Sequence, residues 1–435
     1  MEGEIIGYIE NGRYHGYTEE EIRRLPRVGS NVDIKEWGNI QLCEDVGIDL
    51  LDDLREVYDQ HDAEWIYTVA LLRCCYPGVT DNLLIRRYQR SYASLLHPGL
   101  CMSKNCVCDR LQAIGTELTR IKCFMRKRTS NIKATDSVLI DGTLQCDESI
   151  VNPLSKASKN THRTHHRDFS ILYAFSMEMM EPVCSEIFPG NVIDSKAVSA
   201  FLTDNEIRGG VLIADRGFPP GSIKGVLAAL DREQRRLIHY LLPLRDNRSI
   251  IEQYELTMFD GALAHHPGIE YKKVMAGEDL WYYSFRDPFM AANEERLFVM
   301  NHPDFTAEML AEERTMFGVI VFESDFDAPP LLIYDMYEER WTIELLFKFY
   351  HSALEFDDTR EPNQFSAYAS SFVDLLATIM GVRMKKRMDA ANSFDNISYP
   401  QALDFLRGAM KHKDMSKEDS DWELMRMADK DVRAL

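Results

Sequence analysis

Two short apolar runs, each ending in an aspartate, set the strongest limit on how this chain can fold. Residues 136–141 read Asp-Ser-Val-Leu-Ile-Asp, and residues 211–215 read Val-Leu-Ile-Ala-Asp. Short runs rich in branched side chains are typical of buried strands. Further strand-like runs cover 169–176 and 182–191, and a helical stretch covers 196–202. Strands that alternate with helices predict an α/β sheet, and two strands that end in Asp predict a site at their carboxyl ends.

A third acidic residue lies in a helical stretch near the other end of the chain. On a helix with about 100° per residue, one stripe of about 80° takes in Tyr337, Arg340, Glu344, Lys348 and His351. The stripe therefore predicts one carboxylate beside an aromatic ring, two cations and an imidazole on a single helix face.

Asp141, Asp215 and Glu344 are together the ligand set that a two-metal phosphodiester site requires. Mg²⁺ prefers oxygen ligands, and two such ions about 4 Å apart can activate a water or a 3′-hydroxyl and stabilise the leaving oxygen. Arg340 and Lys348 could hold phosphates beside them. Each aspartate alone has a structural alternative, because a strand-end Asp can cap the loop that follows it.

Length, hydropathy and cysteine content narrow the class of protein. A chain of 435 residues predicts two to three domains. Its apolar runs are shorter than the roughly 20 residues that span a bilayer, and its acidic N-terminus has no signal pattern, so we expect a cytoplasmic protein without a membrane partner. The nine cysteines lack paired two-residue spacings. Reduced core thiols are therefore expected, with a metal site at Cys101, Cys106 and Cys108 as the alternative.

The acidic charge of the chain is unevenly distributed. The net charge is −20, but residues 66–140 carry 12 Lys/Arg against 4 acids, whereas residues 1–65 carry 17 acids and 6 Lys/Arg. A basic segment in an acidic chain is an electrostatic footprint for a polyanion. Residues 64–128 also show helical periodicity, so they predict a helical DNA-binding module, with a plain helical bundle as the alternative. Its basic residues include Arg86, Arg87, Arg90, Arg110, Arg126, Lys127 and Arg128.

The order of these patterns predicts the domains. Strand-like runs at 235–244, 269–274, 280–285, 296–300 and 317–324 predict an antiparallel β insertion. The expected divisions are an acidic N-terminal arm or subdomain (1–65), a helical DNA-binding domain (66–132), the first part of a catalytic core (133–225), a β-rich insertion (226–330), the second part of the core with C-terminal helices (331–411) and a charged tail (412–435).

The motifs resemble those of one family. Asp141-Gly142-Thr143, then Asp215-Arg216-Gly217-Phe218, then Tyr337-x-x-Arg340-x-x-x-Glu344-x-x-x-Lys348 are similar to the motifs of the DDE transposases of insertion sequences. The Tyr-x-x-Arg-x-x-x-Glu signature followed by Lys is that of the insertion-sequence-four group. One departure is His351, which stands where a second Lys or Arg is expected.

The resemblance implies an RNase H-like mixed sheet, an inserted antiparallel β domain and an N-terminal helical domain. It implies that Asp141, Asp215 and Glu344 bind two Mg²⁺, for which Mn²⁺ can substitute. DNA contacts are expected at Tyr337, Arg340, Lys348, His351, Arg216, Trp281, Arg126, Lys127 and Arg128.

The implied activity is metal-dependent cleavage of transposon ends followed by strand transfer into target DNA. The implied partners are the terminal inverted repeats, the target DNA and a second copy of the chain in a synaptic homodimer, at the nucleoid. Two alternatives stay open: a catalytically retired, domesticated DNA-binding protein, and an RNase H-like nuclease without strand transfer. For Trp281, which could stack on an unpaired base, a core strand aromatic is the alternative.

Overall fold

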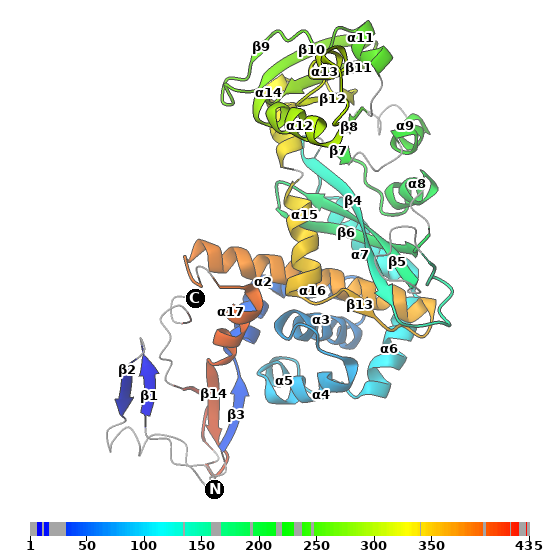
Figure 1. The fold of residues 1–435 in the computed structure, drawn as a ribbon. Coiled ribbons are helices and arrows are strands. Elements are labelled where there is room, and N and C mark those ends of the chain that lie inside the picture. Colours follow the sequence, from blue (N-terminus) through cyan, green and yellow to red (C-terminus); the bar gives the residue numbers. More distant parts are fainter. Residues whose placement is uncertain are drawn as a thin grey trace. The chain divides into compact units, whose positions relative to one another are not determined.

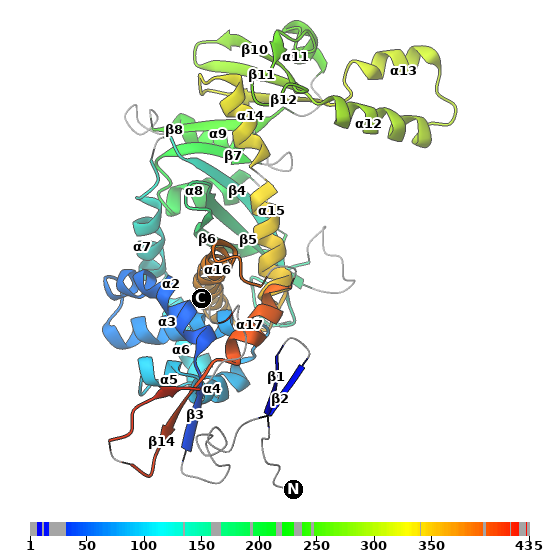
Figure 2. The ribbon, with the colours of Figure 1, turned by 90° about the vertical axis from the view of Figure 1, so that its left-hand side faces the viewer.

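The computed structural model divides the chain into two compact units, each built from separate segments. Unit 1 comprises Met1–Phe124, Gln145–Ser155 and Lys348–Leu435, and unit 2 comprises Met125–Leu144 and Lys156–Phe347. Figures 1 and 2 show that unit 1 is mostly helical and that unit 2 combines the large sheet with helices. The structure describes residues 7–10, 13–16, 32–133, 135–157, 167–191, 195–214, 220–229, 237–244, 248–339, 341–394, 397–417, 419–425 and 432.

The core of unit 2 is a mixed sheet with its first strand in the middle. The strand order is β6-β5-β4-β7-β8, where β5 and β6 are antiparallel and β4, β7 and β8 are mutually parallel. This arrangement confirms the expected RNase H-like α/β sheet. The strand bounds are β4 (Ser137–Asp147), β5 (Arg167–Ser176), β6 (Glu181–Pro189), β7 (Gly210–Ala214) and β8 (Ile238–Pro243).

The strand-like runs of the sequence form the buried centre of this sheet. Val138, Leu139 and Ile140 of β4 are at most 1% exposed, and so are Val211 and Leu212 of β7. Strands buried on both faces have continuous apolar runs of this kind. The helices α8 (Ser195–Asp204) and α9 (Pro220–Ala229) pack against each other, and α8 confirms the helix expected there.

The β-rich region extends the core sheet instead of forming a sheet of its own. Its strands β9 (Gly261–Ala262), β10 (Glu270–Gly277), β11 (Leu280–Arg286) and β12 (Val319–Ser324) are antiparallel, and β12 pairs with β8. The run at 235–244, expected in the insertion, supplies β8, which pairs in parallel with β7. It is therefore a core strand.

One strand expected in this region is wrong. Residues 296–300 lie in α12 (Pro288–Asn301), which is followed by α13 (Ala307–Arg314) and preceded in the chain by the short α11 (Arg248–Gln253). Asp287 caps α12 by accepting hydrogen bonds from the N–H groups of Phe289 (2.7 Å) and Met290 (3.3 Å), and Pro288 occupies the first turn. An Asp N-cap followed by Pro in the first turn strongly favours the start of a helix. This signal outweighs the strand-like apolar run at 296–300.

Unit 1 is a helical bundle around one central helix. The helix α16 (Gln364–Ala390) packs against α2 (Gly38–Arg55), α3 (Gln60–Cys75) and α6 (Lys104–Thr116). The helix α2 therefore lies inside the segment expected to be an acidic arm or subdomain. The other elements are α4 (Asp81–Arg90), α5 (Ala93–Leu96), α7 (Leu118–Thr129), η1 (Phe349–Ala353), α17 (Tyr399–Arg407), a β15-β14-β3 sheet (Glu423–Leu424, Met410–Asp414, Val32–Glu36) and a β1-β2 hairpin (Gly7–Glu10, Arg13–Gly16).

The central helix α16 is also the most apolar long helix of the described chain. It has 27 residues, and its 18-residue apolar window has a mean hydropathy of 1.4. By length and composition it could cross a membrane, although the sequence suggested no such segment. However, 83% of that window is buried inside the protein, and a buried core helix meets the same criteria.

Candidate catalytic site and nucleic-acid contacts

Asp141 lies inside β4, where the pairing with β7 stops. The strand continues to Asp147, so the expectation that it ends at Asp141 is wrong. The parallel ladder with β7 covers Ser137 to Ile140 only. Asp141 is half-buried, and its Oδ1 accepts a hydrogen bond from the N–H of Gly142 at 2.8 Å. The carboxylate therefore lies at the edge of the buried run, where solvent can reach it.

The second aspartate follows the neighbouring strand in the sequence. The last pair of the β4–β7 ladder joins Ile140 to Ala214, and these residues immediately precede Asp141 and Asp215 in the chain. Asp215 itself, together with Arg216 and Arg340, lies outside the residues that the structure describes.

Glu344 is held close to the same sheet by an aromatic contact. It lies in the first turn of α15 (Trp341–Lys348) and is half-buried. Three residues further on, Phe347 packs edge-on against Tyr173 of β5, with ring centroids 5.7 Å apart. Residues three apart on a helix are separated by about 60°, so Glu344 lies on the side of α15 that packs on β5. β5 is also the neighbour of β4, the strand that carries Asp141.

The expected stripe around Glu344 is not on one continuous α-helix. Tyr337 belongs to α14 (Pro330–Glu338), where its ring packs 4.5 Å from that of Phe322. Lys348 is the exposed last residue of α15, and His351 lies in the π-helical turn η1. Both the break after α14 and the π-turn η1 depart from the constant 100° per residue on which the predicted stripe depends. His351 also has a partner in its own unit, because its Nδ1 lies 2.5 Å from an oxygen of Asp357.

The three basic residues of α7 that were expected to contact DNA differ in their exposure to solvent. Arg128 is buried and donates to Glu181 at 2.9 Å, so it anchors α7 to β6, which is a different role from the expected contact with DNA. Arg126 is exposed, but it donates to the carbonyl of Asp204 at 2.9 Å. Lys127 is half-buried.

Trp281 lies in the β-rich part of unit 2. It is a half-buried residue of β11, and the Lys273 ammonium lies 4.4 Å from its ring centroid. Lys273 also donates to the carbonyl of Ala328 at 2.9 Å. The cation is thus fixed over the Trp281 ring by its own hydrogen bond.

The described residues alone contain no group of three His, Cys, Asp or Glu side chains arranged to hold a metal ion. Asp215, the middle member of the expected set, is not among them. The same finding weighs against a metal site at Cys101, Cys106 and Cys108. Of these three cysteines, Cys101 is exposed and the other two are half-buried.

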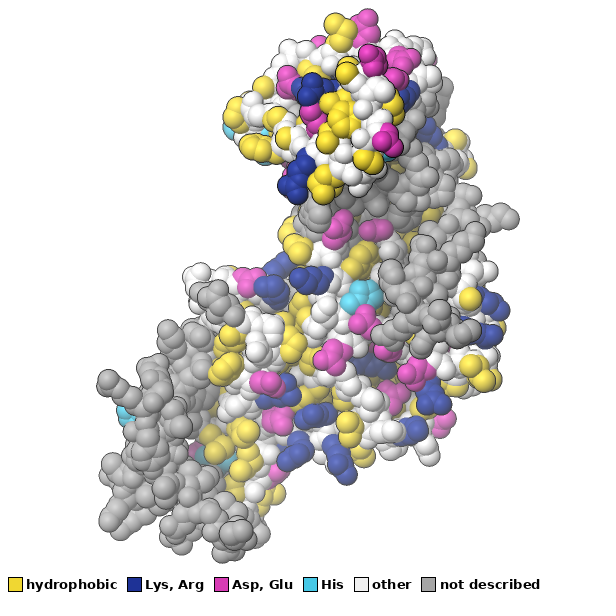
Figure 3. Space-filling model, in the orientation of Figure 1, with side chains coloured by type: hydrophobic (Ala, Val, Ile, Leu, Met, Phe, Trp, Pro, Cys, Tyr) yellow, Lys and Arg dark blue, Asp and Glu magenta, His cyan; other side chains and the backbone are white. Residues whose placement is uncertain are grey.

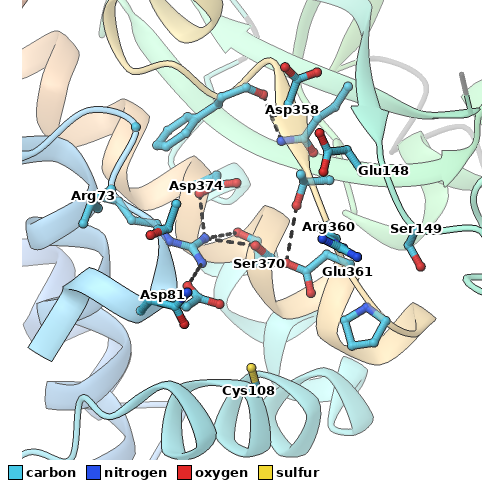
Figure 4. A pocket seen from close by; sticks show the side chains of 18 of the residues that line it. Arg73, Asp81, Cys108, Glu148, Ser149, Asp358, Arg360, Glu361, Ser370 and Asp374 are labelled. Atoms are coloured by element: carbon cyan, nitrogen blue, oxygen red, sulfur yellow. Dashed lines mark hydrogen bonds and ion pairs between the residues drawn. The ribbon is translucent and has the colours of Figure 1, made fainter.

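Unit 1 contains a cavity of about 930 Å³ that the sequence reasoning missed. Arg73 lies at its wall and donates to Asp374 at 2.8 Å and to the Ser370 hydroxyl at 3.0 Å (Figure 4). Asp81 lies 3.4 Å from the same guanidinium. Burial raises the pKa of Asp374 to about 6, although the charge of Arg73 acts in the opposite direction. The sequence feature that could have indicated this cavity is Arg73, a charged residue within the apolar run of α3. Its hydrogen bonds and ion pair join α3 to α16.

Comparison with known proteins gives the family. The family model described as "Transposase DDE domain" matches residues 132–371, and the chain belongs to this family. The structure is similar to that of a piggyBac transposase in a synaptic complex with hairpin DNA, with a TM-score of 0.41 and 11% sequence identity over 85% of this chain and 79% of that one. No curated protein matches the sequence.

Proposed function

We propose that this member of the transposase DDE family cleaves the ends of a DNA transposon and joins the freed 3′-hydroxyl to target DNA. The observation that carries the proposal is the register of the sheet, in which Ile140 pairs with Ala214. In the sequence, an aspartate directly follows each member of this pair: Asp141 follows Ile140, and Asp215 follows Ala214.

Glu344 supports the same site from a different element. Its helix packs on β5 through Phe347 and Tyr173, and β5 adjoins the strand of Asp141. Carboxylate oxygens are among the ligands that Mg²⁺ prefers, and both Asp141 and Glu344 are half-buried. Asp141, Asp215 and Glu344 would hold two Mg²⁺, or Mn²⁺ in their place, and the ions would supply Lewis acidity at the scissile phosphate.

The flanking residues would position the DNA. Lys348 is exposed and follows Glu344 by one helical turn, so its ammonium can contact a phosphate near the carboxylates. Tyr337 and Arg340 would contact the transposon end in the same way, and Trp281 would stack on an unpaired base. The spacing Tyr-x-x-Arg-x-x-x-Glu supports placement in the insertion-sequence-four group, with terminal inverted repeats and target DNA as substrates. We further propose that the protein acts as a homodimer at the nucleoid in the cytoplasm.

A cleavage assay tests this proposal. The substrate is duplex DNA taken from both sides of the gene, incubated with the purified full-length protein and Mg²⁺ or Mn²⁺. We expect cleavage at matching inverted repeats, and joined products when a target plasmid is added. Asp141→Ala, Asp215→Ala and Glu344→Ala should abolish both reactions, whereas Asp304→Asn, at an exposed carboxylate of unit 2, should retain them.

The alternative functions predict different products. Cleavage without joined plasmid would indicate a nuclease that lacks strand transfer. Specific binding of the repeats without cleavage would indicate a retired transposase that has kept DNA recognition. Cleavage that persists in all three alanine variants would refute the assignment of the carboxylates.

A further inference from the structure

The segment that joins α3 to α4 has the form of a helix-turn-helix. α3 ends with the cap residue Tyr76, α4 begins after the cap residue Thr80, and three residues lie between the two caps. The turn is closed by a hydrogen bond from the N–H of Val79 to the carbonyl of Tyr76 at 3.0 Å, and Gly78 has a φ of +67°. A short turn with a glycine between two helices is the arrangement in which the second helix enters the major groove of DNA.

One side of α4 is fixed to the bundle. Leu84 is fully buried and Tyr88 is 7% exposed. The Tyr88 hydroxyl donates to the carbonyl of His97 at 2.5 Å and accepts from the N–H of Leu100 at 3.3 Å. The guanidinium of Arg87 lies 4.8 Å from the ring centroid of Tyr76. These contacts fix the rotation of α4 about its axis, so the direction of its outer face is set.

The outer face of α4 carries Arg86, Gln89 and Arg90, all of them exposed. At about 100° per residue these three side chains fall within about 100° of one another. In the part of the chain that the structure describes, neither Arg86 nor Arg90 forms an ion pair, although Arg73 and Arg110 of the same unit do. Figure 3 shows Lys and Arg side chains over this end of unit 1, with Asp and Glu side chains among them. Two uncompensated guanidinium groups on one fixed face favour a polyanion as the partner.

Charge also decides which half of α4 faces that partner. At its N-terminal end, Asp81 lies against Arg73 (Figure 4). Asp81 also lines the cavity of unit 1, together with Glu355 and Glu361. Acids at that end would repel phosphates. The C-terminal half, which carries Arg86 and the exposed residues after it, is therefore the part that can approach DNA.

From this geometry we propose that α4 is a recognition helix that reads base edges in the major groove of duplex DNA. Arg86 and Gln89 contact the bases, since arginine pairs in a bidentate manner with guanine and glutamine with adenine. Arg90 contacts a phosphate and sets the register. The proposal deepens the proposed function by locating sequence recognition, and it rests on that function only in taking DNA as the substrate.

Selection from a random library tests the proposal without any need for cleavage. The probe is a pool of duplexes with a random central segment, bound to the full-length protein in EDTA so that metal-dependent cleavage cannot occur. The wild type should enrich a defined sequence. Arg86→Ala and Gln89→Ala should each relax the preference at one base pair and weaken binding to the enriched sequence by about 5- to 150-fold. The matched control is Arg55→Ala, at an exposed arginine of α2 that forms ion pairs with Asp52 and Glu64.

Three results would overturn the proposal. The first is an unchanged preference and affinity in both α4 variants, which would place recognition elsewhere. The second is weaker binding to all sequences alike with a reduced salt dependence, which would reduce α4 to a phosphate contact. The third is a wild type that enriches no sequence.

Arg86→Lys replaces Arg86→Ala if the alanine variant does not fold. It should relax the sequence preference in the same direction, because lysine lacks the bidentate fork of arginine. If the wild-type protein enriches a DNA sequence but does not cleave transposon-end DNA, the proposed function is refuted and the assignment of α4 as a recognition helix is retained.

Discussion

At the scale of single residues, the buried charge of unit 1 has the clearest physical consequence. Asp374 is almost fully buried and forms an ion pair with Arg73. Burial raises the pKa of this carboxyl from 3.8 to about 6. The folded state therefore binds a proton more tightly than the unfolded state between about pH 4 and pH 6. The free energy of unfolding should fall as the pH rises through that window.

Arg73→Met should destabilise the protein most strongly above pH 6. Arg73 lowers the pKa of Asp374, so without it the carboxyl must either stay protonated above pH 6 or be ionised without its partner, and the loss of a buried partner costs about 3–5 kcal/mol. Near pH 5 the cost should be smaller, because protonation removes the uncompensated charge. Urea unfolding at both pH values measures the difference. The double variant Arg73→Met/Asp374→Leu should recover most of the stability, and equal losses at both pH values would contradict the account.

The sequence identified the chemistry of the carboxylates but not the partners of the basic residues. Asp141 and Glu344 stand out because a carboxylate in or beside an apolar run is unusual. Arg128 was expected at DNA because three basic residues follow one another, yet it is buried against Glu181. A cluster of charges in a sequence does not reveal which member faces the core. That depends on the phase of α7 relative to the sheet.

At the scale of elements, the apolar runs predicted most strands of the core, since buried strands differ sharply in composition from their neighbours. The errors arose at breaks. The Asp-Pro start makes residues 288–301 helical, and the stripe predicted around Glu344 is divided between α14, α15 and η1. The structure instead ends α14 at Glu338 and converts the helix after Lys348 into a π-turn. A π-turn has no simple compositional signal, so sequence periodicity could not predict it.

The contact of α15 with β5 should position Glu344. Phe347→Ala removes the ring that packs on Tyr173, so the helix loses its fixed rotation. We expect cleavage of transposon-end DNA to fall by at least tenfold while binding of the same DNA changes little. Leu345→Ala, at a neighbouring side chain that is 64% exposed, should leave both unchanged. Equal effects of the two substitutions would exclude a positioning role for Phe347.

The crossing of α6 and α16 depends on a glycine. A Cβ added at Gly115 would lie 1.7 Å from the carbonyl oxygen of Phe365, which cannot move without shifting α16. Gly115→Ala should therefore lower the free energy of unfolding by several kcal/mol, of the order of other severe core changes. Gly225→Ala is the matched control, because a Cβ in α9 meets nothing within 4 Å and alanine is the better helix former by about 1 kcal/mol. Thermal unfolding should move in opposite directions for the two variants, and a neutral Gly115→Ala would contradict the packing.

At the scale of the whole molecule, the chain leaves unit 1, builds unit 2 and returns. Unit 1 combines Met1–Phe124 and Lys348–Leu435 with the short segment Gln145–Ser155, and β3 near the start of the described chain pairs with β14 near its end. The sequence suggested a separate N-terminal helical domain because no local pattern shows that α16 completes its core. Such long-range packing is set by complementary surfaces and not by periodicity.

Removal of the C-terminal segment tests this organisation. A chain that ends at residue 362 lacks α16, which contributes many of the fully buried residues of unit 1. We expect the helices α2, α3 and α6 to lose their cooperative unfolding transition, seen as lost helical circular dichroism and rapid proteolysis between residues 38 and 116. Supplying residues 363–425 as a second chain should restore part of the helical signal. A truncated protein with an intact helical transition would show that the N-terminal helices fold on their own.

The central claim is that Asp141, Asp215 and Glu344 form one metal site, and localised radical cleavage measures it most directly. Fe²⁺ bound in place of Mg²⁺ generates hydroxyl radicals with ascorbate, and these cut the backbone close to the ion. We predict that full-length protein is cut near residues 141, 215 and 344 together, that Mg²⁺ in excess suppresses all three cuts, and that Asp141→Asn removes them. Cuts confined to one of these positions, or unchanged in Asp141→Asn, would contradict a shared site.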